Sequence, residues 1–197
     1  KATVDVVHKN GGVFIADEVQ PGFARTGQAF FGFARHGIVP DMITMGKPMG
    51  NGIPISGLAA KEDVLVAFSD KLPYFNTFGG NPVSIAAAQA VLKYIKDENL
   101  QEHCKKAGAA LLKALKEVQE RHPESVGDVR GAGLFLGFEF VKNDGNKTPD
   151  KDMALNVIEM LRDEHILTSV IGHYGNILKL RPPMVFSEND IDWFATS

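Results

Sequence analysis

Two short apolar runs, each ending in polar residues, organise the first part of the chain. Residues 13–16 read Val-Phe-Ile-Ala and are followed by Asp17 and Glu18. Residues 42–45 read Met-Ile-Thr-Met and are followed by a glycine and Lys47. Such runs are typical of strands buried on both faces, as in a parallel sheet. Because ligands bind beyond the carboxyl ends of strands in open α/β sheets, we expect Asp17 and Lys47 to face one ligand.

Hydrophobic periodicity and capping residues predict the other elements. Asn81 suits the N-cap of a helix and Pro82 its first turn, and Ser187 stands in capping-box register with Asp190. The predicted helices cover about 83–96, 98–121 and 151–164, with another beginning at 187, and the predicted strands cover 55–60, parts of 126–141 and 177–181. The pattern therefore predicts an α/β layer up to residue 97 and a smaller α+β domain over 98–197.

The two ends of the sequence resemble cut ends. The first residues read as the end of a helix that is closed by Asn10 and Gly11, and no initiator Met precedes them. The last predicted helix stops at Ser197 soon after it begins. We therefore expect the sequence to be a piece of a longer protein, with its small domain truncated at the end.

Composition excludes several classes of function. Net charge is −3 with both signs interspersed, and 44% of the residues are hydrophobic, so neither nucleic acid nor a membrane surface is an expected partner. No apolar run has membrane-spanning length, and no signal peptide is visible. The single cysteine, Cys104, excludes an internal disulfide and favours a reducing compartment. The six histidines lack metal-ligand spacing, so we expect no metal site.

The residues after the two strands have a specific chemistry in common. A lysine that forms a Schiff base must lose its proton readily, and a pyridine ring that accepts electrons needs a carboxylate beside its nitrogen. Lys47 and Asp17 meet these two needs. Thr77, just before the predicted helix start at Asn81, supplies a hydroxyl where a helix dipole favours an anion such as phosphate. Together these residues predict a pocket for pyridoxal 5'-phosphate.

Four segments, in order along the chain, resemble the class III pyridoxal-phosphate aminotransferases. Residues 14–23 (FIADEVQPGF) and 40–47 (PDMITMGK) resemble the family signature, and residues 76–82 (NTFGGNP) and 126–134 (VGDVRGAGL) match later family segments. The resemblance covers nearly the whole chain. It implies fold type I of the pyridoxal-phosphate-dependent transferases, with residues 1–97 forming the end of the large, mainly parallel cofactor domain and 98–197 the small domain.

The resemblance also implies a role for each residue of the signature. Lys47 would form the Schiff base with the cofactor and carry the proton in the 1,3-shift. Asp17 would pair with the pyridine nitrogen. Val19 would pack on one face of the ring, and Gln20 would lie near the phenolic oxygen. Glu18, between them, would be a supporting or structural carboxylate.

The resemblance further implies a homodimer with shared active sites, in which Thr77 reaches the phosphate of the neighbouring subunit's cofactor. In the family, the aromatic residue that stacks on the other ring face and the main phosphate-binding loop precede the signature, so we expect both outside this sequence. The isolated piece would then hold Lys47 but only part of the cofactor site, and it could be inactive. Arg130, beside Gly131, is either functional or one half of a structural salt bridge.

One departure from the family pattern concerns the substrate. Many members have an arginine two residues before Ala-Pro-Pro, whereas this chain has Lys179 there and Arg181 directly before Pro182-Pro183. Strand residues two apart share a face, so both cations could bind one carboxylate or phosphate while Leu178 and Leu180 pack inward. The pattern resembles the branch with phospho-lyases of phosphoethanolamine-type amines, a neighbour of the alanine–glyoxylate branch. Alternatively, the two cations are surface charges on an edge strand.

These observations predict an aminotransferase that moves an amino group from an amino acid or terminal amine to a 2-oxo acid through Lys47. A phospho-lyase is the first alternative, and an inactive folding or dimerisation module is a second. A nucleotide hydrolase is a third, because a strand followed by Asp17-Glu18 also resembles a Walker B motif, although no G-x-x-x-x-G-K-[S/T] occurs. We expect a cytoplasmic location, with a mitochondrial one left open.

Overall fold

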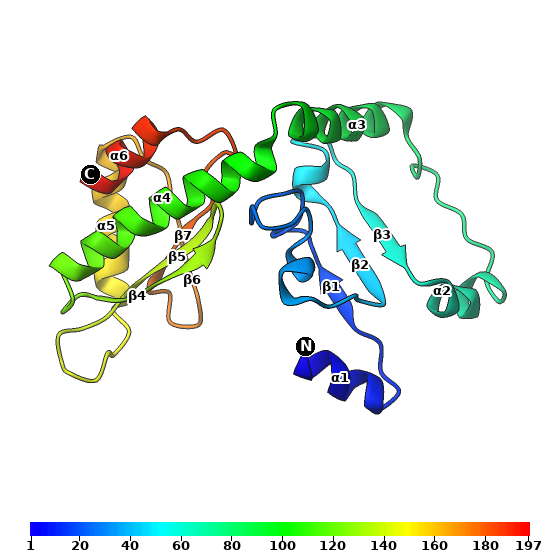
Figure 1. Ribbon diagram of the computed structural model, residues 1–197, viewed down its shortest axis with the longest axis horizontal. Helices are drawn as coiled ribbons and strands as arrows, with labels where there is room; N and C mark the ends of the chain where they lie inside the picture. Colours follow the sequence, from blue (N-terminus) through cyan, green and yellow to red (C-terminus); the bar gives the residue numbers. More distant parts are fainter. The chain divides into compact units, whose positions relative to one another are not determined.

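The computed structural model describes residues 1–66 and 68–197, which form two compact units. Unit 1 comprises Lys1–Gln101, and unit 2 comprises Glu102–Ser197 (Figure 1). The division lies close to the change of pattern at residue 98 in the sequence. Within the described ranges, no helix is long and apolar enough to cross a membrane.

Unit 1 contains a small sheet and helices around it (Figure 1). Its elements are α1 (Ala2–Lys9), β1 (Ile15–Asp17), the 3₁₀ helix η1 (Gly32–His36), β2 (Met42–Met45), the 3₁₀ helix η2 (Lys47–Met49), β3 (Gly57–Ala60), α2 (Glu62–Ser69) and α3 (Pro82–Asp97). The strand order is β1-β2-β3; β1 and β2 are parallel, and β3 is antiparallel to β2. The parallel pairing of the two predicted strands is therefore confirmed, whereas α2 and the two 3₁₀ helices were not predicted.

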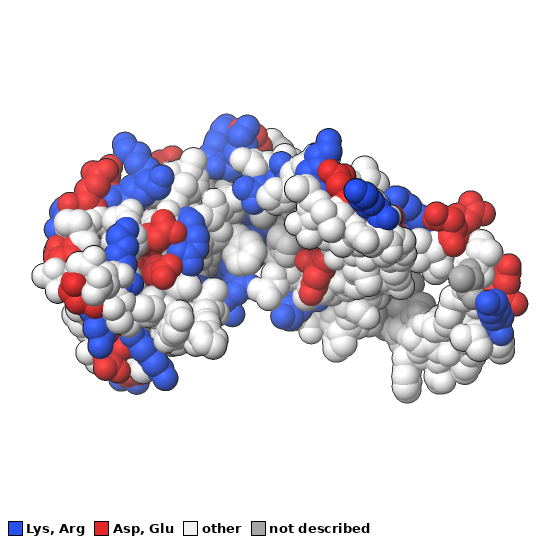
Figure 2. Space-filling view, turned by 90° about the horizontal axis from the view of Figure 1, so that it is seen from below, with Lys and Arg blue, Asp and Glu red and all other residues white. Residues whose placement is uncertain are grey.

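The prediction that residues 13–16 form a strand buried on both faces is wrong for this chain. Ala16 is buried, but Val13 is 49% exposed and Ile15 is 52% exposed. Ile15 and Asp17 lie on the same face of β1, and Val13 precedes the strand. The described residues of unit 1 leave this face uncovered. Figure 2 shows a wide uncharged area over unit 1, whereas acidic and basic side chains are interspersed over unit 2.

Unit 2 is a four-stranded antiparallel sheet with three helices. Its elements are α4 (Leu100–Arg121, beginning just before the unit boundary), β4 (Val126–Ala132), β5 (Phe135–Phe140), α5 (Lys151–Asp163), β6 (Val170–Ile171), β7 (Ile177–Leu180) and α6 (Glu188–Thr196). The strand order is β4-β5-β7-β6. The predicted capping box is present, because Ser187 accepts from the Asp190 amide and Asp190 accepts from that of Ser187.

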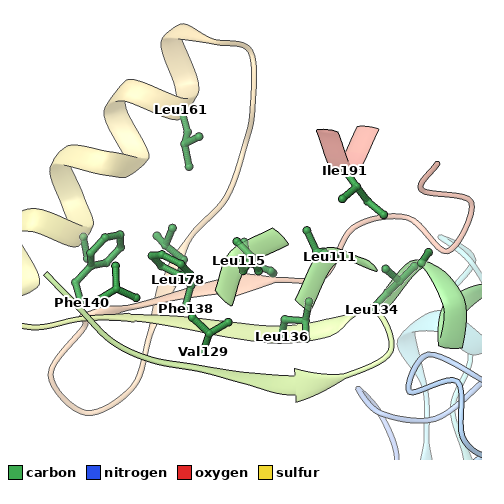
Figure 3. Packing of buried hydrophobic residues seen from close by; sticks show 14 of the residues in the cluster. Leu111, Leu115, Val129, Leu134, Leu136, Phe138, Phe140, Leu161, Leu178 and Ile191 are labelled. Atoms are coloured by element: carbon green, nitrogen blue, oxygen red, sulfur yellow. The ribbon is translucent and has the colours of Figure 1, made fainter. Parts of the chain in front are cut away.

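The core of unit 2 forms where α4, α5 and α6 pack against one face of this sheet (Figure 3). Alternate residues of β5 and β7 point toward the helices, and Leu178 and Leu180 are buried as predicted. The buried residues of the cluster are Cys104, Ala107, Leu111, Leu115, Val126, Val129, Leu134, Leu136, Phe138, Phe140, Ala154, Leu161, Leu178, Leu180 and Ile191. Every helix of unit 2 thus contributes to a single core.

Two glycines allow α4 to approach the turn between β4 and β5. A Cβ atom built on Gly108 would lie 2.2 Å from the carbonyl carbon of Gly133, which is far inside any van der Waals contact. Gly133 itself has a φ of +53°, a left-handed conformation that glycine adopts without strain. Only a glycine at position 108 is therefore compatible with this spacing between helix and turn.

Candidate active site

The carboxyl ends of β1 and β2 bring Asp17 and Lys47 to one edge of the unit 1 sheet. Asp17 pairs in register with Thr44, and the backbone N–H of Glu18 donates to the Thr44 carbonyl at 2.9 Å. Lys47 lies three residues after Thr44, just beyond the end of the parallel strand β2. The two residues singled out from the sequence therefore lie at the same sheet edge, where α/β folds bind ligands.

Two hydrogen bonds orient the carboxylate of Asp17. Its Oδ1 accepts from the backbone N–H of Val19 at 3.1 Å and from the hydroxyl of Thr44 at 3.3 Å. The side chain itself is exposed. A carboxylate that is oriented by neighbours yet accessible can accept a further bond from the protonated ring nitrogen of a ligand.

Lys47 begins η2 and lines a hollow of about 940 Å³. Its φ of +38° is unusual for a residue other than glycine, and it follows directly on Gly46. The other wall of the hollow comes from the turn before α3, including Asn76, Phe78 and Gly80. The lysine amine is exposed, and the volume is that of a typical small-molecule site.

The other residues predicted to contact the cofactor ring lie near this edge. Val19 is half-buried, and a Cβ atom built on Gly46 would lie 3.9 Å from Val19 Cγ2, so this side chain approaches the residue before Lys47. Gln20 is exposed. Asp17, Val19 and Gln20 do not line the hollow that Lys47 lines. The structure thus gathers these residues at one edge without enclosing them in one cavity.

The start of α3 differs from the anion site that the sequence predicts. The side-chain oxygen of Asn81 accepts from the N–H groups of Val83 and Ser84, and Pro82 has no N–H group. The free amides of the first helical turn are therefore already bonded to the helix's own cap. Thr77 is exposed in the preceding turn. Any phosphate contact here would depend on Thr77 and the turn, with no contribution from the amides of the helix.

A buried carboxylate that the sequence analysis missed lies at the start of β2. Asp41 is 8% exposed and accepts from Lys61 Nζ at 2.8 Å, from the Phe14 N–H at 2.8 Å and from His8 Nε2 at 2.7 Å. These hydrogen bonds hold the pKa of Asp41 far below its usual range, and the largest contribution comes from Lys61, followed by Phe14 and His8. Asp41 thus ties α1 and the residue after β3 to the beginnings of β1 and β2. Its partners are too distant in the chain for a local pattern to reveal them.

Lys179 and Arg181 lie together in unit 2 and line a second hollow of about 480 Å³, together with Thr168 and Ser169. β7 pairs with both β5 and β6, so the alternative of an edge strand is wrong. The Arg181 guanidinium lies 4.8 Å from the centre of the Phe135 ring. Its Nε is buried without a hydrogen-bond partner among the described residues, and burial lowers the pKa of this group. A buried, unpaired guanidinium nitrogen is suited to bind an anion.

Arg130 has a structural explanation. Its Nη1 lies 2.6 Å from Asp128 and 2.5 Å from Glu139, which pairs opposite Asp128 on β5. These two carboxylates raise the pKa of the guanidinium. The geometry favours the salt-bridge interpretation of Arg130. In the part of the chain that the structure describes, no group of three or more histidine, cysteine or carboxylate side chains could hold a metal ion.

Comparison with known proteins decides the family. The family model described as "Aminotransferase class-III" matches residues 2–197. The chain belongs to the class III aminotransferases. This result confirms the resemblance seen in the sequence and leaves no support for a nucleotide hydrolase. The class III family depends on pyridoxal phosphate, as the residues around Lys47 predict.

Relatives of this class III chain include two kinds of enzyme. It is 45% identical over 188 residues to ethanolamine-phosphate phospho-lyase homolog 1 of Caenorhabditis elegans, covering 94% of this chain and 40% of the relative. It is 43% identical to alanine–glyoxylate aminotransferase 2 homolog 2, mitochondrial, of Arabidopsis thaliana, covering 98% of this chain and 40% of the relative. The chain thus spans about two fifths of the length of these curated relatives.

Solved structures of class III enzymes have the same fold. A phospholyase from Arthrobacter in complex with phosphoethanolamine matches with a TM-score of 0.93 at 40% identity, covering 98% of this chain and 45% of that one. An aminotransferase of Bacillus anthracis matches with a TM-score of 0.90 at 36% identity, covering 99% and 45%. The predicted fold of the pyridoxal-phosphate-dependent transferases is confirmed.

The residues at the sheet edge fit this cofactor. Lys47 offers an accessible amine beside a hollow of suitable volume, and Asp17 offers a carboxylate that two hydrogen bonds already orient. An aldehyde and a pyridinium nitrogen are the groups that such a pair would bind.

Proposed function

We propose that the whole protein is a pyridoxal-phosphate-dependent aminotransferase that moves an amino group from an amino acid or terminal amine to a 2-oxo acid. The observation that supports this best is the common sheet edge of Asp17, at the end of β1, and Lys47, just beyond the end of the parallel strand β2. The family and the structural relatives agree with this class of chemistry.

In this proposal the two residues divide the chemistry between them. The cofactor, when bound, supplies an aldehyde and an electron-accepting ring. Asp17 would keep the proton on the ring nitrogen, because an anionic carboxylate beside a base favours its protonated form. Lys47 would hold the cofactor through Nζ and then, once released, move a proton at the reacting carbon of the substrate. The exposed amine and the oriented carboxylate suit these tasks.

Three further residues would support the ring and the phosphate. Val19 would pack against one ring face, and Gln20 would donate toward the phenolic oxygen. Thr77 would bind the phosphate of the cofactor in a second copy, which makes the active form a homodimer. The exposed position of Thr77, in a turn with exposed aromatic neighbours, supports a contact with another subunit. The assignment of units 1 and 2 to the large and small domains of the family belongs to this proposal.

Lys179 and Arg181 would bind the anionic group of the substrate. The buried, unpartnered Nε of Arg181 is the supporting observation. In the full-length enzyme, we expect Arg181→Gln to raise KM for an anionic amine about tenfold to hundredfold, because a hydrogen bond to a charged group contributes about 1.5–3 kcal/mol. Arg130→Gln, which removes an arginine paired to two carboxylates, is the matched control and should leave KM unchanged.

A phospho-lyase is the second candidate function. Two cations share the unit 2 hollow with the residues Thr168 and Ser169, a set of groups that suits phosphate at least as well as carboxylate. A relative and a structural neighbour bear phospho-lyase names. The two reactions differ in their products, because elimination releases inorganic phosphate and amino transfer gives a keto product without it.

The experiment uses the full-length protein loaded with pyridoxal phosphate. Borohydride reduction followed by peptide mapping should label Lys47, and Lys47→Ala should abolish the label while Lys9→Ala retains it. A label on another lysine, or none, overturns the proposal, and an absence of cofactor uptake would favour a folding module. Alanine, 4-aminobutyrate and phosphoethanolamine are then offered in turn, with assays for keto product and inorganic phosphate.

The compartment belongs to this proposal as well. We propose a cytoplasmic enzyme on the basis of cysteine usage. Two of the relatives are named as mitochondrial, one from Arabidopsis thaliana and one from Pongo abelii. Fractionation of cells that express the full-length protein distinguishes the two compartments.

A further inference from the structure

Glu18 is a buried carboxylate between two residues of the proposed cofactor site. It is 2% exposed, whereas Asp17 before it is exposed and Val19 after it is half-buried. Charged side chains are rarely buried unless specific partners bind them. Neither role proposed for Lys47 and Asp17 makes use of this group, so its contacts require their own explanation.

Both oxygens of Glu18 bind the start of η1. Oε2 accepts from the backbone N–H of Gly32 at 2.7 Å, and Oε1 accepts from that of Phe33 at 2.8 Å. Hydrogen bonds to an ionised carboxylate are the stronger kind. The side chain therefore attaches the end of β1 to a segment fourteen residues later in the chain.

The backbone of Glu18 is held as firmly as its side chain. Its N–H donates to Thr44 O on β2 at 2.9 Å, and its carbonyl accepts from the Gly22 N–H at 3.1 Å. A Cβ atom on Gly22 would lie 2.6 Å from this carbonyl oxygen, and one on Gly32 would lie 3.3 Å from Oε2. The loop thus closes tightly around residue 18, with little room for the peptide to rotate.

We propose that Glu18 is a positioning residue for the cofactor site, in that its buried carboxylate fixes the backbone that orients Asp17. The connection is direct, because the Asp17 carboxylate accepts from the N–H of Val19, the residue after Glu18. If residue 18 moves, the Val19 amide moves, and Asp17 loses one of its two orienting bonds. This inference rests on the proposed function, which assigns the ring nitrogen to Asp17.

The test substitution is Glu18→Gln in the full-length holoenzyme. An amide of the same size can accept through its oxygen only, so one of the two N–H groups faces another donor and loses its bond. The visible absorption band of the bound cofactor is followed as a function of pH. We expect the midpoint pH of its change to differ from that of the wild type, because Asp17 binds the ring nitrogen less well in the variant. Cofactor affinity should fall about tenfold, as expected for loss of a bond to a charged group.

Asp41→Asn is the matched control. Asp41 is a buried carboxylate of the same unit that also accepts a backbone N–H, but at the opposite ends of β1 and β2. We expect it to lower the thermal midpoint and to leave the spectroscopic pH midpoint unchanged. If Glu18→Gln lowers the thermal midpoint but keeps the wild-type pH midpoint and affinity, Glu18 is only structural and the inference is overturned.

A second variant tests the inference if Glu18→Gln does not fold. Gly32→Ala leaves Glu18 intact but displaces the start of η1, because the new Cβ would lie 2.7 Å from Pro21 Cβ. It should shift the pH midpoint in the same direction, and an unchanged midpoint would refute the inference. Failure of the proposed function would give a different result, because borohydride treatment of the wild-type holoenzyme would then label a lysine other than Lys47.

Discussion

The two units of the chain differ in how completely they bury their apolar residues. Unit 2 closes one core between its sheet and all three helices (Figure 3). Unit 1 holds most of the large apolar side chains that remain exposed in the chain, including Tyr74 at 73%, Phe75 at 85% and Phe78 at 83%. The candidate chemistry of Asp17 and Lys47 belongs to the unit with the less complete core.

This difference has a physical meaning for stability and for the site. Burial of apolar surface stabilises a fold by about 25 cal/mol per Å², so unit 2 contains the larger share of this stabilisation. The uncovered face of β1 also bears Asp17, so the carboxylate lies at the end of an apolar surface. Exposed aromatic residues around Thr77 are compatible with the homodimer that we propose.

The largest expected effect on stability comes from comparing one side-chain truncation in each unit. Leu111 is 1% exposed in the core of unit 2, whereas Ile15 is 52% exposed on β1. We expect Leu111→Ala to lower the free energy of unfolding of unit 2 by about 2–5 kcal/mol. Ile15→Ala should change that of unit 1 by no more than about 0.5 kcal/mol. Urea titration checks both, with fluorescence of the single tryptophan, Trp193, reporting unit 2 and hydrogen exchange reporting unit 1.

The contrast between the units is contradicted if, in the full-length protein, Ile15→Ala lowers the free energy of unfolding as much as Leu111→Ala does. That result would mean that other parts of the whole protein cover the β1 face. Wild-type behaviour of Leu111→Ala would instead mean that the unit 2 cluster contributes little to stability.

The next effect concerns the close approach inside unit 2. Replacing a glycine inside a helix by alanine normally stabilises the helix by about 1 kcal/mol. At Gly108 the sign should reverse, because the new Cβ would overlap Gly133, and overpacking costs about 1–3 kcal/mol. Trp193 fluorescence in a urea titration measures this change. Ala109→Gly, at the next position and on the exposed side of α4, is the control that measures the ordinary difference in helix propensity between alanine and glycine. A gain in stability for Gly108→Ala would contradict the close packing of α4 on Gly133.

A smaller effect is expected at the start of α3 in unit 1. Asn81→Ala removes the cap that accepts from Val83 and Ser84, and such caps contribute about 1 kcal/mol. Hydrogen exchange of the first turn of α3 should accelerate accordingly. Gln89→Ala, at an exposed position of the same helix, should have almost no effect. If both variants behave alike, Asn81 does not stabilise the helix start.

Local signals in the sequence predicted much of this architecture. The periodic helices, the strand at 42–45, the Asn81 cap and the Ser187–Asp190 capping box depend on residues within a few positions of one another. Alternation along residues 177–181 likewise predicted the inward Leu178 and Leu180, because side chains alternate between faces in any strand.

Features that depend on distant residues escaped prediction. The exposure of Ile15 is decided by what packs on the sheet, which an apolar run alone does not indicate. The partners of Glu18 and Asp41 lie fourteen or more residues away, and no spacing rule connects them. At the candidate site, the sequence indicated Asp17 and Lys47 by type and position, but the anion predicted at the start of α3 conflicts with the Asn81 cap, which already bonds the helix amides.

The last comparison concerns pH dependence, and it involves the carboxylates that stabilise the two units. Asp41 ties together several elements of unit 1, whereas Asp190 only caps α6 in unit 2, and hydrogen bonds lower the pKa of both. A carboxylate whose pKa is lowered by folding stabilises the fold above its unfolded pKa of about 3.9 and loses this contribution as the pH falls toward its folded value. The protection of unit 1 amides from hydrogen exchange, relative to their intrinsic rates at each pH, should therefore decrease in the wild type below about pH 4, and Asp41→Asn should reduce this acid dependence. Asp70→Asn, at an exposed position with no ion pair among the described residues, should leave the dependence as in the wild type. An acid response that Asp41→Asn does not change would mean that the bonds from Lys61, Phe14 and His8 do not couple folding to pH.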